Sequence, residues 1–430
     1  MKVYFDCTFT YHSGLNTGIQ RVVRNIIARE KLYNDKYGLK TYPVICFGGN
    51  YYEIDRDFVL DVKPVTASIG QKIKSIFDRF RQGVLKNFRF KTLSFRMMVK
   101  VFNGLEWLLK RLFWVIKGLR VFRTVIISGN KKVNFEEEDI FILLDAFWTY
   151  DLGRAIGRTN LNRDQIYSVI YDLIPVTHPD FVEEQDHSRF MKMLPVLATH
   201  VGNFIGISNA VAEELKLYFQ NEYPQHKVKI GFFILGSDFK PKSSEIRFEL
   251  RSQFADIFKN APVWLVVGTI EPRKNHTYIL SVFDEMWKQG ANDKLLIIGR
   301  IGWKCDRIIS RIQNHIELGK KLFFFTDASD DELLYSYRHS EGLIFASLVE
   351  GFGLPIVEAM ASGLKVLCSD IPVFREVGGE YPSYFNTEAK EPLVDLITQS
   401  RGIPQKNQKK WVTWDESADI FFKKLKLNKK

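Results

Sequence analysis

Cysteine is scarce in this sequence of 430 residues, with only Cys7, Cys46, Cys305 and Cys368. They form no CxxC pair and no dense framework, so a disulfide-stapled secreted module is not favoured and a reducing compartment fits better. No group of His and Cys has the spacing of a zinc site. A run of about 18 uncharged apolar residues, long enough to cross a membrane, is also missing. The start, MKVYFDCTFT, lacks the regions of a signal peptide and predicts a first strand.

What is present is an ordinary globular composition. Hydrophobic residues make up 46% of the chain and charged residues 26%, with a mean hydropathy of −0.13. This composition excludes the disordered and fibrous classes. At about 150 residues per domain, the length predicts two or three domains, each large enough to bury a core.

Positive charge is concentrated in one segment. The whole chain carries a formal net charge of +11. Residues 70–132 contain 16 basic and two acidic residues, which gives this segment a charge of +14 and leaves −3 for the rest of the chain. A local excess of this size needs a local explanation.

Bulky apolar residues are interleaved with the basic ones in 70–132, among them Phe77, Trp107, Phe113 and Trp114. Basic and apolar residues at irregular helical spacing are typical of an amphipathic segment on an anionic membrane surface. Alternatively, the segment packs its apolar face on its own domain. Arginine, lysine and aromatic residues also suit nucleic acid, which is the least favoured of the three interpretations.

Short β-rich runs alternate with longer helical patterns. In the first part of the chain, strands are expected at 2–7, 42–47, 140–144, 167–171, 204–207 and 227–235, and helices at 19–33 and 209–219. In the second part, strands are expected at 263–267, 294–298, 321–325, 343–346 and 365–368, and helices at 275–289, 306–318, 330–339 and 355–362. This alternation predicts an α/β class with parallel sheets, in two Rossmann-like domains that face each other across a cleft and join near residue 240.

Two loops of the second part follow strands directly. The first, GTIEPRKN at 268–275, places Arg273 and Lys274 before the N-terminus of a helix. Ligands of an open α/β sheet sit beyond the carboxyl ends of the strands, and two cations there suit a diphosphate. The alternative is a solvated turn with two exposed cations. The second loop, GRIGW at 299–303, is weak evidence by itself.

A third loop, EGFGLPIVE at 350–358, follows the strand expected at 343–346. Gly351 and Gly353 allow the backbone to approach an anion or a hydroxyl closely. A helix that begins near Leu354 would direct its positive end at the ligand. Glu350 precedes the turn and Glu358 lies one helical turn inside it, so the two carboxylates can reach different parts of one ligand.

These residues resemble those of a known family. Glu350 and Glu358, separated by seven residues, resemble the E-x7-E motif of retaining GT-B glycosyltransferases of family 4 (GT4, group 1). The loop at 268–275 resembles the donor-diphosphate loop of that family, and DDEL at 330–333 an element before its sugar-binding strand. The strong resemblance covers 262–378. The first half matches more loosely, through Gly18, ISNA at 207–210 and LGSD at 235–238.

The resemblance implies roles for particular residues. Arg273 and Lys274 would neutralise the donor diphosphate and stabilise the leaving nucleoside diphosphate, Glu350 would contact the transferred sugar, and Glu358 would bind the ribose hydroxyls. The remaining donor-contacting residues implied are glycines and the start of the third-loop helix: Gly18, Gly268, Gly299, Gly351, Phe352, Gly353 and Leu354.

The sequence departs from the family in its first half. Many relatives carry a His-Asp pair at the end of a mid-domain strand, where the histidine meets the donor sugar. Here the place reads YDLIP, so the imidazole is absent and Asp172 remains as a catalytic candidate. We interpret His178 as an ordinary loop residue rather than as a replacement for the missing histidine. The Gly-Gly of some relatives is Thr17-Gly18.

The expected chemistry needs no metal and no cofactor beyond the nucleotide-sugar substrate. The transition state resembles an oxocarbenium ion, and charge develops on the leaving diphosphate, where the two cations stabilise it. The family resemblance implies retention of anomeric configuration, with the leaving phosphate assisting deprotonation of the acceptor. Asp55-Arg56-Asp57 matches the D-x-D of metal-dependent transferases, but we interpret this short match as a surface turn.

The function expected from the resemblance is transfer of a hexose from a nucleotide-sugar to a hydroxyl of a growing, lipid-linked glycan such as O-antigen or capsular polysaccharide. GDP-mannose is the first choice of donor, by loose resemblance to O-antigen mannosyltransferases; dTDP-rhamnose and UDP-hexoses are the alternatives. A non-catalytic or nucleic-acid-binding Rossmann protein is the remote alternative. The expected partners are the donor, the glycan acceptor and an anionic membrane surface, without nucleic acid, and the expected location is cytoplasmic, on the inner face of the membrane.

Two domains and a C-terminal helix are predicted. Residues 1–240 form an acceptor-binding Rossmann-like domain with the basic amphipathic helical insertion 70–132. Residues 241–408 form the nucleotide-sugar-binding Rossmann-like domain. Residues 409–430 form a C-terminal helix that crosses back to the first domain.

Overall fold

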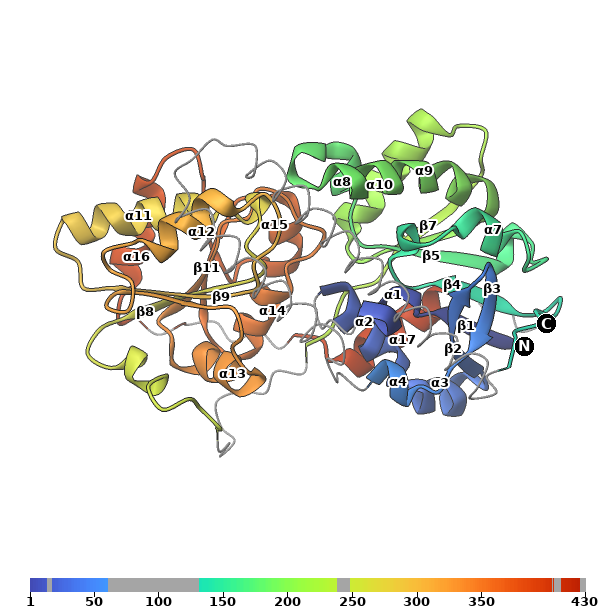
Figure 1. The fold of residues 1–430 in the computed structure, drawn as a ribbon, viewed down its shortest axis with the longest axis horizontal. Coiled ribbons are helices and arrows are strands. Elements are labelled where there is room, and N and C mark those ends of the chain that lie inside the picture. Colours follow the sequence, from blue (N-terminus) through green and yellow to red (C-terminus); the bar gives the residue numbers. More distant parts are fainter. Residues whose placement is uncertain (14–17, 61–130, 238–247, 404, 406–410, 426–430) are drawn as a thin grey trace, which may run out of the picture. The chain divides into compact units, whose positions relative to one another are not determined.

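The computed structural model describes residues 1–13, 18–60, 131–237, 248–403, 405 and 411–425. Contacts within the chain divide it into two compact units, Met1–Tyr167 and Ser168–Lys430. Figure 1 colours the chain along its sequence, from blue at the N-terminus to red at the C-terminus. All but the last two residues of the basic segment 70–132 lie outside the described residues. The domain boundaries predicted near 240 and 408 stay a prediction.

A seven-stranded sheet has the order β3-β2-β1-β4-β5-β6-β7. Its strands are β1 (Lys2–Asp6), β2 (Lys40–Phe47), β3 (Asn50–Glu53), β4 (Ile140–Leu143), β5 (Ile166–Ile170), β6 (Asn203–Gly206) and β7 (Lys229–Phe232). Strand β1 is parallel to β2 and β4, with Tyr4 opposite Tyr42 and Phe141, whereas β3 is antiparallel to β2. Consecutive residues of β1 are buried, as expected for a parallel strand that is covered on both faces.

The helices within the described residues of the first unit are short. They are α1 (Thr8–Ser13), α2 (Gly18–Ile27), α3 (Glu30–Tyr37), α4 (Asp57–Leu60) and α7 (Leu152–Ile156), with 3₁₀ turns at Phe147–Thr149 and Arg163–Gln165. The single helix predicted at 19–33 is therefore wrong. Arg29 leaves the helical conformation at φ −99° and ψ 24°, and its guanidinium donates to the Asn25 carbonyl at 3.0 Å, so a turn separates α2 from α3.

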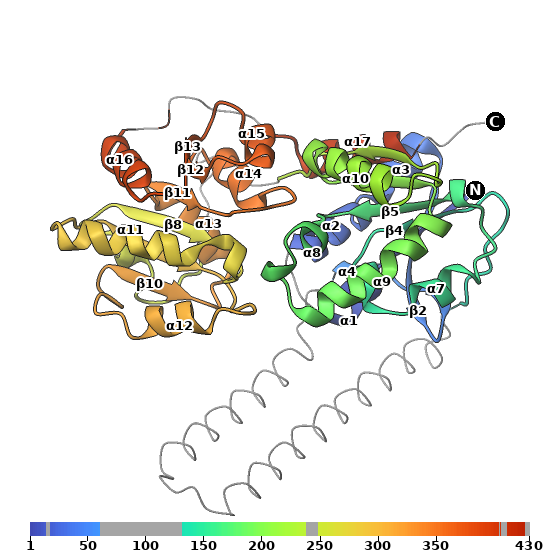
Figure 2. The same ribbon diagram turned by 90° about the horizontal axis from the view of Figure 1, so that it is seen from above.

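The first three helices of the second unit are drawn in green in Figure 2. They are α8 (Ile174–Thr177), α9 (Glu184–His200) and α10 (Asn209–Glu222), with a 3₁₀ turn at Pro179–Phe181. Helix α10 packs against β6 and β7. The Ser208 hydroxyl accepts from the Val211 amide at 3.1 Å, so Ser208 is the N-cap of α10.

A six-stranded sheet completes the second unit, in the order β10-β9-β8-β11-β12-β13, with all strands parallel. Its strands are β8 (Val263–Val267), β9 (Lys294–Ile298), β10 (Leu322–Phe325), β11 (Gly342–Phe345), β12 (Lys365–Ser369) and β13 (Ser383–Phe385). Its helices are α11 (His276–Lys288), α12 (Asp306–Gln313), α13 (Asp330–His339), α14 (Leu354–Ala361), α15 (Pro372–Gly378) and α16 (Glu391–Ser400), and the 3₁₀ turns of this part are Ala255–Phe258 and Pro272–Lys274. Helices α11 and α12 lie on one face of this sheet and α13 on the other (Figure 1).

The order of both sheets places a reversal of strand order at their middle, between β1 and β4 in one and between β8 and β11 in the other. Ligands of open α/β sheets bind beyond the carboxyl ends of strands at such reversals. The α/β class predicted from the alternation of strands and helices is confirmed, and the strands predicted at 263–267 and 294–298 coincide with β8 and β9.

The last helix, α17 (Trp414–Lys424), packs on β7. Its N-cap is Thr413, which forms a capping box with Glu416. The Ser417 hydroxyl donates to the Ile234 carbonyl at 2.6 Å, and the rings of Phe421 and Phe233 lie 5.0 Å apart. These contacts hold the C-terminal helix beside a strand of the seven-stranded sheet.

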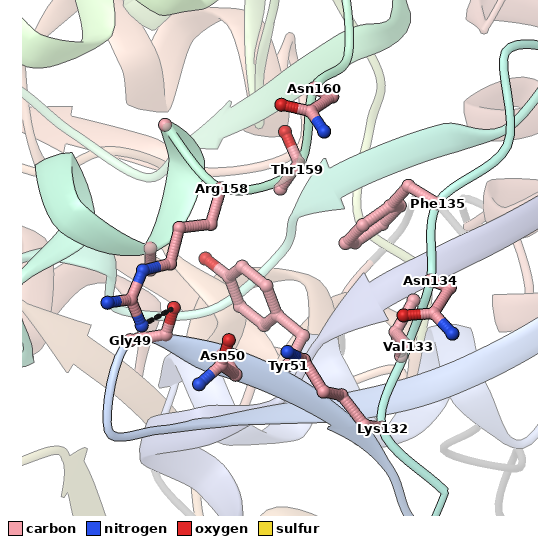
Figure 3. Close-up of a pocket in the computed structure, with 12 residues that line it drawn as sticks. Gly49, Asn50, Tyr51, Lys132, Val133, Asn134, Phe135, Arg158, Thr159 and Asn160 are labelled. Atoms are coloured by element: carbon pink, nitrogen blue, oxygen red, sulfur yellow. Dashed lines mark hydrogen bonds between the residues drawn. The ribbon is translucent and has the colours of Figure 1, made fainter.

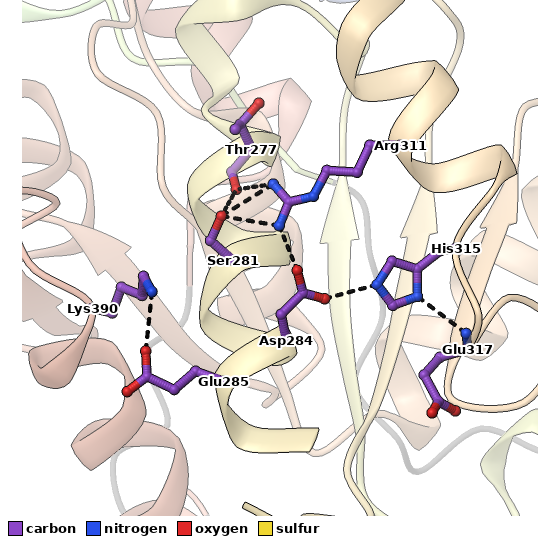
Figure 4. A network of polar contacts seen from close by, with 8 residues as sticks. All are labelled: Thr277, Ser281, Asp284, Glu285, Arg311, His315, Glu317 and Lys390. Atoms are coloured by element: carbon purple, nitrogen blue, oxygen red, sulfur yellow. Dashed lines mark hydrogen bonds and ion pairs between the residues drawn. The ribbon is translucent and has the colours of Figure 1, made fainter. Parts of the chain in front are cut away.

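One cavity of 680 Å³ lies within the first unit, beside the β2–β3 hairpin (Figure 3). In the second unit, the outer ends of α11 and α12 are joined by a polar network (Figure 4). Asp284 of α11 accepts from Arg311 at 2.5 Å and pairs with His315 at 2.7 Å. These side chains are part-exposed, so the network contributes little stability. No helix within the described ranges is long and apolar enough to cross a bilayer.

Candidate functional site

The loop after β8 carries the two predicted cations. It continues through the 3₁₀ turn Pro272–Lys274 to Asn275, which has a left-handed φ of 56° and precedes α11. The Arg273 carbonyl accepts from the Leu348 amide at 2.8 Å, which ties the loop to the segment after β11. The cations therefore lie at the carboxyl ends of β8 and β11, the position that the sequence predicts.

Two glycines allow the loops after β8 and β9 to touch. Gly268 has a φ of +145°, and a Cβ placed on Gly299 would lie 1.7 Å from the Gly268 carbonyl oxygen. The Ile270 amide donates to the Arg300 carbonyl at 2.8 Å. Gly268 and Gly299 thus support the backbone of the cation loop, and their predicted contact with the donor stays a prediction.

Four charged side chains meet at this point. Glu350 Oε2 pairs with Arg273 Nη1 at 2.6 Å, and Glu350 Oε1 pairs with Lys274 Nζ. The other side of the guanidinium, Nη2, pairs with Glu271 Oε1 at 2.6 Å. The side chains of Arg273 and Lys274 are 17% and 11% exposed, so this donor cluster of Glu271, Arg273, Lys274 and Glu350 is largely shielded from water. The solvated-turn interpretation of 268–275 is therefore wrong.

The cations fix the charge of Glu350. Burial alone would raise the pKa of its carboxyl, but Arg273 and Lys274 outweigh burial and lower the pKa to about 2. Glu271 differs, because burial raises its pKa against the opposing effect of Arg273. Its second oxygen is buried without a hydrogen-bond partner among the described residues. Glu350 of the donor cluster is thus firmly ionised, whereas burial makes the ionised form of Glu271 less favourable.

Lys274 is poised to take an additional anionic partner. Burial lowers the pKa of its ammonium group, against the raising effect of Glu350. The ammonium also lies 4.5 Å from the centre of the Phe345 ring. It has three N–H donors, and an incoming anion would favour its charged form.

The third loop makes close backbone contacts. A Cβ on Gly351 would lie 1.9 Å from the Tyr171 carbonyl oxygen, and the Ser208 hydroxyl donates to the Gly351 carbonyl at 2.8 Å. Gly353 has a φ of +103° and is the N-cap of α14. Phe352 between them is 3% exposed. The glycines that were singled out in the sequence are therefore required by the backbone, whether or not they also face a ligand.

Helix α14 begins at Leu354, as predicted, with Pro355 in its first turn. Glu358, one turn further, is buried, and its Oε2 accepts from the Tyr337 hydroxyl at 2.7 Å. This bond orients one carboxylate oxygen. The ribose contact implied for Glu358 stays a prediction.

The candidate residues from the first half of the sequence lie in different units. Asp172 belongs to the second unit and is half-buried, and its Oδ1 accepts from the Ile174 amide at 3.1 Å. Burial raises the pKa of Asp172, and the charge of Arg273 opposes that shift. Asp172 is thus within electrostatic reach of the donor cluster. Gly18 begins α2 in the first unit, and a Cβ there would meet no described atom within 4 Å, so its contact with the substrate stays a prediction.

Sequence reasoning missed two buried groups of the cation loop. Glu271 stands within the quoted loop, but its spacing alone did not show that it pairs with Arg273. His276, the first residue of α11, is 3% exposed, and neither ring nitrogen has a partner among the described residues. Burial, and then the charge of Lys274, lower its pKa to about 3, so the ring is neutral. A polar residue at a position of the helix that faces the core was the available signal.

A model of one protein family matches this region. Residues 248–400 match the family described as glycosyl transferases group 1. The chain carries a group 1 glycosyltransferase domain. The match includes Arg273, Lys274, Glu350 and Glu358, so the resemblance found in the sequence is confirmed for this domain.

Curated relatives extend the similarity beyond the group 1 domain. The serotype-specific mannosyltransferase WbdA of Escherichia coli is 33% identical over 319 residues, which are 70% of this chain and 38% of the relative. The O-antigen chain mannosyltransferase RfbU of Salmonella typhimurium is 27% identical over 247 residues, 57% of this chain and 63% of the relative. The chain thus spans less than two thirds of the length of these relatives.

Solved structures share the fold over nearly the whole chain. Anabaena HepE, in complex with UDP and glucose, has a TM-score of 0.54 at 11% identity, covering 98% of this chain and 94% of its own. Sucrose-phosphate synthase from Thermosynechococcus elongatus has a TM-score of 0.55 at 14% identity, covering 99% and 94%. This likeness in fold confirms the predicted GT-B fold class.

Proposed function

We propose that the protein transfers a hexose from a nucleotide-sugar to a hydroxyl of a growing glycan, with mannose from GDP-mannose as the first choice. The donor cluster at the carboxyl ends of β8 and β11 is the observation that carries this proposal. Its two cations are held within 3 Å of carboxylates in a shielded place, and a diphosphate is the ligand class that two adjacent cations favour. The names of the curated relatives, mannosyltransferases of O-antigen chains, support the choice of sugar and acceptor.

The chemistry follows from where charge develops. Cleavage of the bond between the anomeric carbon and the diphosphate oxygen leaves negative charge on the diphosphate. Arg273 and Lys274 are fixed before the reaction, so they stabilise that charge without reorganisation. The carboxylate of Glu350, which the same cations hold ionised, orients both and accepts hydrogen bonds from sugar hydroxyls. The acceptor oxygen bonds to the anomeric carbon from the face of the leaving group, which would retain the anomeric configuration, and its proton passes to the leaving diphosphate. No metal takes part.

The donor is tested by a thermal-shift screen against GDP, UDP, dTDP and ADP, followed by a transfer assay with the sugar nucleotide of the base that binds. A ligand at about 100 times its dissociation constant adds about 2.7 kcal/mol of stability. We expect GDP to give the largest shift and GDP-mannose to release GDP when a mannosyl acceptor is present. A larger shift with dTDP or UDP would favour the rhamnosyl or glucosyl alternative. Absence of any shift and of any transfer would contradict the proposal.

The membrane surface is the second part of the proposal and rests on the sequence of 70–132. Anionic lipids contribute about 1 kcal/mol for each nearby Lys or Arg, so a few engaged residues would hold the enzyme beside a lipid-linked acceptor. Co-sedimentation with phosphatidylserine vesicles should be strong at low salt and should weaken as salt screens the charges. Replacing Trp107, Phe113 and Trp114 with Ser should weaken it further without lowering the melting temperature. Failure of the wild type to co-sediment at low salt would leave the packing interpretation.

A further inference from the structure

The cavity of the first unit lies between three segments of chain (Figure 3). One wall is the hairpin turn and the start of β3, at 49–51. The second is the segment 132–135, which pairs with β3 through the bond from the Val133 amide to the Tyr51 carbonyl at 2.9 Å. The third is 155–160, the end of α7 and the turn that follows. No residue predicted for the donor site lines this cavity, so it is a separate feature of the molecule.

Uncharged amides and cations dominate the polar lining. Asn50, Asn134 and Asn160 each present a side-chain amide, and Lys132 and Arg158 add positive charge. Among the described residues, the lining contains no Asp or Glu. Asn134 and Asn160 are exposed and Asn50 is half-buried. None of the three side-chain amides makes a protein hydrogen bond within the described part of the chain, so a ligand can replace water at their donors and acceptors.

The walls are held by bonds that do not use those amides. Arg158 Nη1 donates to the Gly48 carbonyl at 3.1 Å, so the guanidinium contacts the hairpin turn. Asn160 has a left-handed φ of 57°, a conformation that Asn tolerates better than most residues. The Tyr51 hydroxyl lies 3.1 Å from that of Tyr150, which fixes the aromatic floor.

Phe135 completes the floor. Its ring packs edge-on against Tyr51, with centroids 6.1 Å apart, and it remains part-exposed at the cavity. Figure 3 shows Phe135, Asn160 and Lys132 around the ring of Tyr51. An apolar ring face combined with unpaired amides matches a sugar ring, which has an apolar C–H face and hydroxyls that both donate and accept. Three amides against two cations in the lining favour a sugar over phosphate, and a metal ion would need carboxylates.

We propose that this cavity binds the already assembled part of the glycan acceptor, one or more sugar units away from the hydroxyl that reacts. Its 680 Å³ falls within the range of about 300–1,000 Å³ that is usual for small-molecule sites. The proposal rests on the proposed function for the identity of the glycan, but the binding itself is independent of catalysis. Such a subsite makes affinity depend on acceptor length, because a short acceptor cannot reach it.

The test uses the full chain without donor and titrates it with mannotetraose and with free mannose, by saturation-transfer NMR and calorimetry. The double variant Asn134→Ala/Asn160→Gly removes two amides and keeps the backbone of residue 160 unstrained. Asn34→Ala on the exposed surface of α3 is the matched control. Loss of two neutral hydrogen bonds should weaken mannotetraose binding by about 10-fold or more. Affinity for GDP and the melting temperature should not change in either variant.

In the transfer assay, the double variant should raise the KM for a tetrasaccharide acceptor by the same factor and leave that for a monosaccharide unchanged. If the double variant melts at a lower temperature than the wild type, Lys132→Ala takes its place, with Lys31→Ala of α3 as the control. Lys132→Ala should then also lower the affinity for mannotetraose. Mannotetraose that fails to bind the wild type, or that binds every variant equally, overturns the proposal. Mannotetraose binding that depends on the amides, in a protein that transfers no hexose from any donor, would support the subsite and reject the proposed function.

Discussion

Each sheet has one pair of neighbouring strands that is followed by buried carboxyl groups, β8 and β11 in one sheet and β1 and β4 in the other. The pKa values of Glu350 and Asp145, one from each sheet, are shifted in opposite directions. Glu350 follows β11 beside Arg273 and Lys274, and its pKa is lowered to about 2. Asp6 ends β1 and Asp145 follows β4, and burial, together with the charge of Asp6, raises the pKa of Asp145 to about 7.

The partners explain the difference. Asp145 accepts from the amides of Thr10 and Ala146, and Asp6 from Thr8 and from the Tyr150 hydroxyl at 2.7 Å. These donors are neutral and do not balance the two negative charges. The same position at a reversal of strand order thus holds a carboxylate paired with two cations in one sheet. In the other it holds two carboxyls that accept from neutral donors, with Arg24 as a cation that interacts with Asp145.

The largest effect expected from this comparison concerns the cations. Arg273→Ala or Lys274→Ala removes charge that stabilises the leaving diphosphate, so kcat/KM should fall by about 10²–10³-fold. Lys288→Ala, an exposed cation at the end of α11, is the control and should behave as wild type. Steady-state kinetics with saturating acceptor measures the effect. Near-normal rates in both loop variants would remove the donor cluster from the mechanism.

A smaller effect separates the roles of the two glutamates. Glu358→Gln should lower the affinity for the bare nucleoside diphosphate by about 10–100-fold, because a charge-assisted bond to ribose is lost. The oxygen that accepts from the Tyr337 hydroxyl remains in this variant. Glu350→Gln should lower the affinity for the sugar donor more than the affinity for the bare nucleotide. Calorimetry with both ligands on both variants distinguishes these patterns, and the reverse pattern would exchange the two assignments.

The carboxyl pair of the first unit predicts a dependence of stability on pH. The folded-state pKa of Asp145 lies above its ordinary 3.8, so the folded chain binds more protons than the unfolded chain between about pH 4 and 7. The contribution of Asp145 to the free energy of unfolding therefore falls as pH rises through this window, by at most about 1.4 kcal/mol per pH unit. The charged groups acting in this cluster include Asp6 and Arg24.

The variant Asp145→Asn should flatten that slope, although it costs a hydrogen bond at every pH. Asp35→Asn on α3, where the side chain is exposed, is the matched control and should keep the wild-type slope. Urea unfolding at half-unit intervals from pH 4 to pH 8 gives the slopes. Equal slopes for wild type and Asp145→Asn would show that Asp145 does not titrate in this window.

The smallest effect concerns metals. Since the proposed mechanism assigns charge stabilisation to Arg273 and Lys274, transfer should survive excess EDTA unchanged. Asp55 is exposed and accepts from the Asp57 amide at 3.0 Å at the start of α4, as expected for the surface turn. Loss of activity that Mg²⁺ or Mn²⁺ restores would make these aspartates candidates again, with Asp55→Asn as the next variant.

The sequence predicted features that depend on neighbours along the chain. The strand at 263–267 matches the structure because it is a short apolar run. The helix at 330–339 matches because its sequence carries a helical pattern with its own N-terminal capping box. Arg273 and Lys274 were found because the turn after a strand end is a local pattern. Glu271, Asp145 and the amides of the cavity were missed, since their meaning depends on partners that are distant in sequence or on burial. Nothing in the sequence shows, for example, that Asn134 and Asn160 line one cavity.

The most direct test of the donor cluster is calorimetric titration of GDP into the wild type, Lys274→Ala and Lys288→Ala at low and at physiological salt. We predict that the wild type and Lys288→Ala bind GDP equally. Lys274→Ala should lose at least about 10-fold in affinity, because a charged hydrogen bond to phosphate is worth about 1.5–3 kcal/mol. Equal affinity of all three proteins for GDP would contradict the assignment of the donor diphosphate to the carboxyl ends of β8 and β11.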